Sequence, residues 1–538
     1  MAAPALASPV QERTDLYFQA RTAAALGDRD RAAELYADLV IAGAADDQLA
    51  ATAMTEAIGI GRFDLATRIA GVERHHDAYN MDGRLWLLLR AMEEGEDSGD
   101  FTDALTLLTE DVRVSYDFIA PFIRAWSGVA SSKQAAQDHG ISQIAEMGTD
   151  LPLGVHAPEQ LGYMYLLLGR PKDALPHIEK ALARSGGREA ALRLAFADGL
   201  AGAGAPLEAL RLLEGEDGIL VDARERIRSG KSLGMKIKGP ADALAQLMVA
   251  VAVQLNNASD ARLPLSFAQL ARSIDPGDGE ASIVTALLLD AQERTDEALA
   301  TLAQVSKSSL LKPQLRDTQL QILLNANRGE DALAIAKADV DQRPDQPGVW
   351  ARYGDAFTNL ERWEEAADAY ARERALNPDD WTVLFLEAVA RNEAGDWETS
   401  KSLLNSAMAL APEQPVILNY LGYISLEKGE DLERADALIR AASALAPRDP
   451  SITDSLGWAY YKLGRYDQAV EILGRAAQLD PLQAEIHEHH GDALWKAGRT
   501  IEARFAWQAA LTTAEEEDRI ARLDDKLLLG LTETNAAP

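Results

Sequence analysis

The sequence contains no cysteine, and this absence excludes several kinds of site at once. Without a thiol the chain can form no disulfide, no thiolate nucleophile and no cysteine-based zinc site. The absence does not decide the compartment, because a cysteine-free chain is compatible with both the cytoplasm and the periplasm.

Basic residues are scarce relative to acidic ones. Lys and Arg total 53 against 85 Asp and Glu, which gives a formal net charge of −32. Nucleic-acid binding needs clustered Lys and Arg to contact phosphates, so the composition argues against it. We interpret the acidity as a source of solubility for a long molecule, the alternative being an acidic groove that selects basic partners.

Long apolar runs and strand-like patterns are also missing. The longest apolar stretch, around 243–255, is interrupted by Gln246 and Gln254 and is too short to span a bilayer, so we expect no transmembrane segment. No run of alternating β-branched residues predicts a sheet. A 6% aromatic content with abundant Ala and Leu favours an all-helical chain.

What the sequence does contain is a period. Pro378, Pro412, Pro447 and Pro481 are spaced by 34 or 35 residues, and Pro344 extends the series backwards by another 34. A period of this length indicates one supersecondary unit that is copied and stacked.

The copy at 450–483 shows the unit most clearly. Its first helix carries Leu456 and Tyr460 on one face, with Gly457 where a neighbouring helix must approach closely. Gly464 follows where that helix must end. The second helix has small and apolar residues at helical spacing, namely Ala469, Leu473 and Ala476. The unit resembles the tetratricopeptide repeat, a pair of antiparallel helices.

Copies of this pattern cover most of the chain, including one around Gly99, Ala104 and Leu108. They predict an all-α fold, a right-handed α-solenoid in which each unit packs only on its neighbours. We predict the following organisation: 1–12 a disordered tail or signal-peptide remnant, 13–110 N-terminal repeats, 111–152 a degenerate helical region, 153–223 repeats, 224–278 a second degenerate helical region, 279–517 the C-terminal repeat array, 518–531 a capping helix, and 532–538 a tail.

The N-terminus bears on the compartment. Ala5-Leu6-Ala7 resembles the cleavage site of a secretory signal, although the basic start and apolar core of such a signal are missing. We therefore expect a periplasmic protein, with the cytoplasm as the alternative.

Several fragments resemble chemical motifs only weakly. Gly230-Lys231-Ser232 resembles the end of a phosphate-binding loop, but Glu225 stands where that motif needs a glycine. His487, His489 and His490 lie within four residues, and His487 and His490 could share a metal with Glu488. However, His490 occupies a position where other units carry Leu or Tyr, which predicts a packed histidine. We predict no catalytic residue, cofactor or metal. An enzyme that uses the repeats as a recognition arm would instead need a pocket in 111–152 or 224–275.

Binding should occur on the first helices, which line the concave face of a stacked array of this kind. Five aromatic residues fall there in a chain that is poor in aromatics, and aromatic side chains carry much of the binding energy at interfaces. The predicted partner-binding residues lie in the three units from 415 to 517: Asn419, Tyr420, Tyr423, Asp454, Trp458, Tyr461, Lys462, Asp492, Trp495 and Lys496.

These units go beyond the generic repeat. The segments 419–423, 454–458 and 491–495, together with Glu502-Ala503-Arg504 and Trp507, resemble the C-terminal repeats of bacterial outer-membrane lipoprotein adaptors for the carboxyl-terminal processing protease. The resemblance covers about 415–515. It implies a superhelix that binds a periplasmic protease and cell-wall hydrolases, and presents the hydrolases for degradation. The cysteine that anchors a lipoprotein is absent here.

The sequence therefore predicts a non-catalytic adaptor that docks partner proteins on the concave face of a repeat superhelix. The alternative is a cytoplasmic scaffold for regulation or complex assembly.

Overall fold

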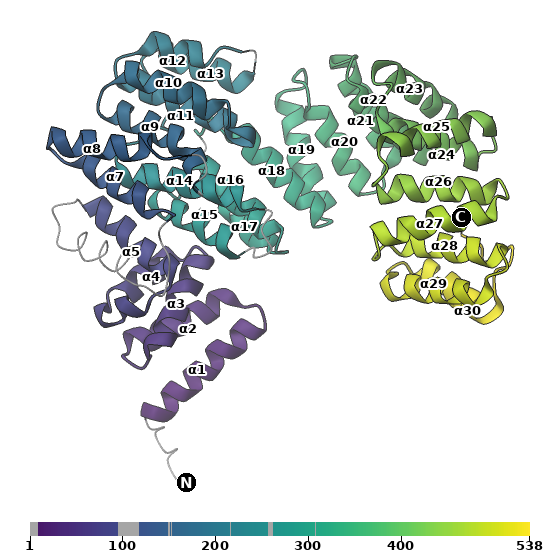
Figure 1. Ribbon diagram of the computed structural model, residues 1–538, viewed down its shortest axis with the longest axis horizontal. Coiled ribbons are helices and arrows are strands. Elements are labelled where there is room, and N and C mark those ends of the chain that lie inside the picture. Colours follow the sequence, from purple (N-terminus) through teal and green to yellow (C-terminus); the bar gives the residue numbers. More distant parts are fainter. Residues whose placement is uncertain are drawn as a thin grey trace. The chain divides into compact units, whose positions relative to one another are not determined.

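Every regular element in the described part of the chain is a helix, as a computed structural model shows (Figure 1). The structure describes residues 9–94, 118–148, 151, 153–215, 217–256, 262–306 and 308–537. Successive helices pair along the chain, which confirms the predicted all-α fold of tandem helix pairs. The signal-like Ala5-Leu6-Ala7 and the copy around Gly99, Ala104 and Leu108 lie outside the described residues. No helix in the described ranges is both long and apolar enough to cross a bilayer.

The chain divides into two compact units, Met1–Ala326 and Asn327–Pro538. The helices of the first unit are α1 (Pro9–Ala25), α2 (Arg29–Ile41), α3 (Asp47–Gly59), α4 (Phe63–Ala70), η1 (Glu73–Ala78), α5 (Met81–Glu94), α7 (Ala120–Ala130), α8 (Gln134–Ala145), η2 (Gly154–His156), α9 (Ala157–Leu167), α10 (Pro171–Leu182), η3 (Gly186–Arg188), α11 (Glu189–Gly202), α12 (Pro206–Leu212), α13 (Gly218–Arg228), α14 (Pro240–Gln254), α15 (Arg262–Ile274), α16 (Gly279–Asp290), α17 (Thr295–Ala303) and α18 (Lys312–Asn325).

The helices of the second unit form a more regular series. They are α19 (Gly329–Gln342), α20 (Val349–Asn359), α21 (Trp363–Leu376), α22 (Trp381–Glu393), α23 (Trp397–Leu410), α24 (Pro415–Glu427), α25 (Leu432–Leu445), α26 (Pro450–Lys462), α27 (Tyr466–Leu479), α28 (Ala484–Lys496), α29 (Thr500–Thr513) and α30 (Glu517–Leu529). From α20 to α29 each even-numbered helix packs on the next odd-numbered one, and α30 packs on α29.

The first unit is not a simple stack. Helix α15 packs against α3 and α5, which precede it by more than 160 residues. Ser266 donates to Asp82 over 3.4 Å between Oγ and Oδ2, and the Gln269 amide donates to the carbonyl of Gly59 at 3.5 Å. We expected each helix pair to pack only on the adjacent pairs. That expectation is wrong for the part of the chain before Asn327.

The reason lies in α14. This helix contains the apolar stretch noted in the sequence, and its residues from Ala243 to Ala252 are buried except Gln246. A helix that is apolar on all sides must be covered on all sides. Helix α14 accordingly contacts α5, α7, α9, α15 and α16, so the region predicted as degenerate lies at the centre of the unit.

The turn inside each pair depends on one backbone conformation. A residue with φ between 54° and 87° recurs every 34 or 35 residues at the end of the first helix: Glu293, Asn327, Glu361, Gly395, Gly429, Gly464 and Gly498. Glycine adopts this left-handed conformation without strain, whereas a residue with a side chain does so at a cost. The repeat therefore persists in the backbone where the sequence no longer shows its glycine.

The two helices of a pair approach closely at a second recurring place in the register. A Cβ atom added to Gly457 would come within 2.5 Å of Leu473 Cγ, and one added to Gly354 within 2.6 Å of Tyr370. At Gly491 an added Cβ would overlap the ring of Trp507. The large residue of the second helix thus occupies the space that glycine leaves on the first.

The left-handed position gives a reciprocal test in the second unit. Glu361→Gly should raise the free energy of unfolding by about 1 kcal/mol, because it removes the strain of an exposed residue at φ 56°. Gly498→Ala should lower the free energy of unfolding by a similar amount. The added Cβ would have no atom within 4 Å, so the change introduces backbone strain without a steric clash. Urea unfolding followed by circular dichroism measures both. Shifts of the same sign in the two variants would contradict this account of the turn.

Candidate protein-binding surface

The ten predicted binding residues lie on the first helices α24, α26 and α28. Asp454, Trp458 and Asp492 are buried, whereas the other seven are partly or fully exposed. We call these seven residues the first-helix surface: Asn419, Tyr420, Tyr423, Tyr461, Lys462, Trp495 and Lys496.

Trp458 lies beneath this surface as a support. Its ring is 0% exposed because both of its faces are covered. The ring of Tyr461 stacks on it with centroids 4.4 Å apart and an interplanar angle of 6°, and His489 stacks on it at 4.0 Å and 14°. The sequence placed Trp458 in the open groove, but His489, from the next first helix, closes the ring off.

Helices α24 and α26 are joined by polar contacts between their side chains. The indole N–H of Trp458 donates to Glu427 Oε1 at 3.2 Å, and the amide of Asn419 donates to Ser455 Oγ at 3.1 Å. Lys462 also pairs with Glu427 at 3.2 Å and lies 5.1 Å from the centroid of the Trp458 ring. Together with the stacked rings, these contacts fix the position of the Trp458 side chain.

His489 and Asp454 form a buried pair between α28 and α26. The Nδ1 atom of His489 lies 2.8 Å from Asp454 Oδ2. Burial on its own would lower the pKa of His489, but the Asp454 carboxylate, with smaller contributions from Glu485 and Asp492, raises it above the ordinary value. The pair is thus favoured in its charged form although it lies inside the protein.

The tyrosines of the first-helix surface keep their protons. Burial raises the pKa of Tyr420 to about 12 and raises the pKa values of Tyr423 and Tyr461 further above the ordinary value. Each therefore offers an uncharged ring with a hydroxyl group, which suits contact with both apolar and polar atoms of a partner.

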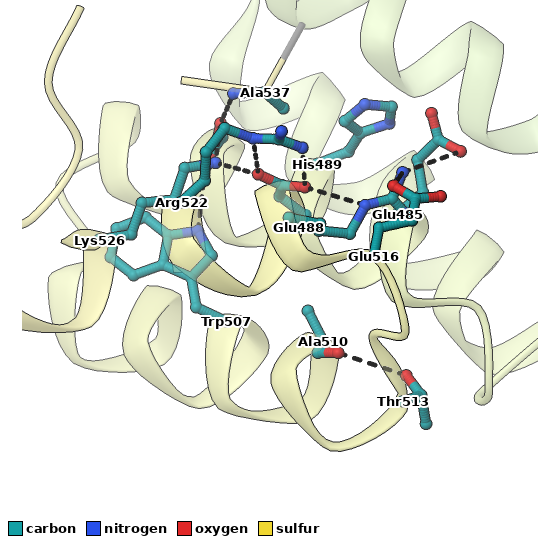
Figure 2. A network of polar contacts seen from close by, with 12 residues as sticks. Glu485, Glu488, His489, Trp507, Ala510, Thr513, Glu516, Arg522, Lys526 and Ala537 are labelled. Atoms are coloured by element: carbon teal, nitrogen blue, oxygen red, sulfur yellow. Dashed lines mark hydrogen bonds and ion pairs between the residues drawn. The ribbon is translucent and has the colours of Figure 1, made fainter. Parts of the chain in front are cut away.

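Asp492 is closed off by the segment after the last pair. Its carboxylate accepts from the Trp507 indole at 2.9 Å and from Lys526 of α30 at 2.8 Å. Lys526 also contacts Glu488 at 2.7 Å, and Arg522 lies 3.3 Å from the same carboxylate (Figure 2). Sequence reasoning missed Lys526. The sequence did contain a signal for it: Lys526 lies in the predicted capping helix, which has to cover the acidic residues Glu488 and Asp492 of the last repeat.

Of the other two histidines of α28, His487 has a main-chain partner and His490 is partly buried. His487 lies 3.0 Å from the carbonyl oxygen of Pro481, and burial lowers the pKa of His490 to about 4. Glu488, the third residue of the metal site considered from the sequence, accepts a hydrogen bond from Lys526. Among the residues that the structure describes, no group of three His, Asp or Glu side chains is arranged to hold a metal ion.

The first unit contains a buried ionic cluster whose charges could suggest an active site. Arg188 of η3 lies 2.8 Å from Glu159 of α9 and 2.6 Å from Glu280 of α16. Burial would lower the pKa of Arg188, but the two carboxylates raise it well above the ordinary value. All three side chains are buried and paired, so the cluster acts as a cross-link between helices.

A cavity in the same unit is too small for a substrate. It has a volume of about 50 Å³ and lies between the 234–238 loop, α14 and the start of α16, beside Asp242 and Asp278. Ligand pockets usually measure hundreds of Å³. The neighbouring Ser232, from the fragment that resembles a phosphate loop, instead donates to Asp198 at 3.0 Å.

Comparison with known proteins identifies the repeats. Residues 457–498 match the family described as TPR repeat, and residues 318–380 match the family described as tetratricopeptide repeat. Superkiller protein 3 of Schizosaccharomyces pombe is 28% identical over 98 residues, a stretch that spans 18% of this chain and only 7% of that protein.

Solved structures of similar type cover about a third of the chain. TTC0263, a thermophilic TPR protein of Thermus thermophilus, is 24% identical, with a TM-score of 0.31, over 34% of this chain and 98% of its own. MamA from Desulfovibrio magneticus is 19% identical, with a TM-score of 0.28, over 31% of this chain and 93% of its own. YrrB, described as a TPR protein with an unusual peptide-binding site, is 13% identical, with a TM-score of 0.28, over 35% and 97%.

The pair of His489 and Asp454 predicts a pH dependence of stability. Because the folded pKa of His489 lies above the ordinary value of 6.5, the pair stabilises the second unit fully below pH 6.5. This contribution is lost as the pH rises through the folded pKa. The difference in urea midpoint between the wild type and His489→Gln should therefore be larger at pH 5.5 than at pH 8.5. His487→Gln is the matched control, and an equal difference at both pH values for His489→Gln would contradict the assignment.

Proposed function

We propose that this tetratricopeptide repeat protein is a non-catalytic adaptor that docks segments of partner proteins on the first-helix surface. The observation that carries the proposal is the layered arrangement of Tyr461 on the buried Trp458, with His489 behind it. An aromatic ring that is fixed before binding loses little conformational entropy when a partner covers it.

The composition of the surface supports a protein partner. Four aromatic side chains and two lysines lie among its seven residues, and one of the lysines, Lys462, is paired with the neighbouring carboxylate of Glu427. Aromatic rings contact main-chain and apolar side-chain atoms of a peptide, while the tyrosine hydroxyl groups and the lysines supply directed polar contacts.

The resemblance at about 415–515 supports a more specific proposal. The partners would be a carboxyl-terminal processing protease and cell-wall hydrolases, and the compartment would be the periplasm. An adaptor that binds both proteins accelerates cleavage by raising the effective concentration of the substrate near the protease. A cytoplasmic scaffold for complex assembly is the alternative, and fractionation of the native cell separates the two.

Capture with matched variants tests the docking surface. Tyr423→Ala/Tyr461→Ala should reduce partner binding at least tenfold, because each lost aromatic anchor costs about 1 kcal/mol or more. The control is Ile501→Ala/Phe505→Ala, which removes two side chains of α29 that are each 73% exposed.

The experiment uses the full chain as bait on periplasmic and cytoplasmic fractions, with quantitative mass spectrometry and circular dichroism of each variant. A processing protease captured from the periplasmic fraction by the wild type and by the control supports the adaptor. Equal recovery by the tyrosine variant would show that the first-helix surface is not the docking site.

A further inference from the structure

The segment after α30 returns across α28 and contacts two of the predicted binding residues. Gly530 lies so close to Trp495 that an added Cβ would overlap the indole ring. The backbone N–H of Ala537 donates to Asp492 Oδ2 at 2.9 Å (Figure 2). Residues 530–537 therefore lie against the last repeat at Trp495 and Asp492.

This segment has a defined conformation of its own. The side chain of Asn535 accepts from the Thr532 N–H at 2.7 Å and donates to the Gly530 carbonyl at 3.0 Å. Asn535 is 3% exposed and Ala537 is 6% exposed, whereas Glu533 and Thr534 face solvent. The contact is thus made by small and uncharged residues, and the one charged side chain points away.

Release of the segment would uncover a site rather than a bare hydrophobic core. Asp492 Oδ2 would lose a main-chain donor but keep its contact with Lys526, and the edge of Trp495 would become accessible. These two residues are i, i+3 on α28, so they lie on one side of the helix. The Asp492 carboxylate can accept a hydrogen bond from a main-chain N–H, and one helical turn away the edge of Trp495 leaves room only for a residue without a side chain. Both features suit an extended peptide with a glycine opposite the ring.

We propose that residues 530–537 are an internal ligand of the last repeat, which a partner segment must displace before it binds at Asp492 and Trp495. The competing segment is an extended peptide that places glycine against Trp495 and a backbone N–H at Asp492. The identity of the natural competitor rests on the proposed function, whereas the internal contact is testable without a partner. A tethered segment competes at an effective concentration of about millimolar, so it suppresses weak ligands and yields to stronger ones.

Two pairs of full-length variants separate release of the segment from general damage. Ala537→Pro removes the N–H that donates to Asp492, and Ala536→Pro places the same ring one residue earlier, where that N–H is kept. Gly530→Ala adds a Cβ that overlaps Trp495, whereas Gly498→Ala adds one at the same φ of 82° with no atom within 4 Å.

Hydrogen exchange of residues 531–537 first reports whether the segment is released. Exchange should be faster in Ala537→Pro and Gly530→Ala than in the wild type and the two controls. Circular dichroism and the unfolding midpoint show that α30 stays folded. If neither variant releases the segment, it is an integral part of the terminal helix cap and the proposal is wrong.

Binding of a probe then tests whether the uncovered site accepts a ligand. The probe is a fluorescent synthetic peptide with the sequence of residues 529–537, and a scrambled peptide is the control. Fluorescence anisotropy should give a Kd for Ala537→Pro at least tenfold lower than for the wild type and Ala536→Pro, because the apparent affinity scales with the fraction of open chains. Release of the segment without any gain in peptide binding would overturn the proposal.

The two proposals fail in distinguishable ways. If the peptide binds the released variants but Tyr423→Ala/Tyr461→Ala captures partners normally, the internal ligand stands and the docking surface is wrong. If partner capture depends on the tyrosines but is unchanged in variants whose segment is released, the displacement step is wrong and the docking surface stands.

Discussion

The structure of the second unit depends on the close approach of the two helices in each pair. At Gly354, Gly422, Gly457 and Gly491 the first helix has no side chain, and a large residue of the second helix fills the space. This contact fixes the distance and rotation between the helices. The remaining side chains of the first helix are then directed either to the next first helix or to solvent, so their position in the register decides which of them can bind a partner.

The first helices are connected by side chains as well as by packing. Trp458 with Glu427, Asn419 with Ser455, and His489 with Asp454 each join one repeat to the next, at sequence separations of 31 to 36 residues. Because the two residues of each pair lie about one period apart, a substitution in one repeat removes a contact of the adjacent repeat as well. The partly exposed ring of Tyr461 stacks on Trp458, a ring that is held by the repeats on both sides, and this gives it the rigidity that a binding surface requires.

The sequence predicted the helix pairs because proline, glycine and small residues recur at fixed spacing. It could not reveal that Glu361 and Glu293 adopt the left-handed conformation. These two turns keep the positive φ of the other repeats but lack the glycine that marks it in the sequence. Burial of Trp458 was missed because it depends on His489, a residue outside the repeat signature. The packing of α15 on α3 and α5 joins distant segments through an apolar helix, and a local period carries no information about such a contact. The segment 530–537 is too short to show any period.

The distribution of acidic residues bears on how this surface recognises a partner. The chain is strongly acidic, yet three buried carboxylates of the first helices are paired with cationic groups: Asp454 with His489, Glu488 with Arg522 and Lys526, and Asp492 with Lys526. Burying each of these charges is tolerable only because a cation lies within hydrogen-bonding distance. What these first helices present to solvent is then a set of neutral tyrosines, with Lys496 and the ion pair of Lys462 and Glu427 beside them. Under the proposed function, recognition at this surface would rest on main-chain and apolar contacts more than on attraction of a basic segment. The small residues of 530–537, which lie against Trp495, have that chemistry.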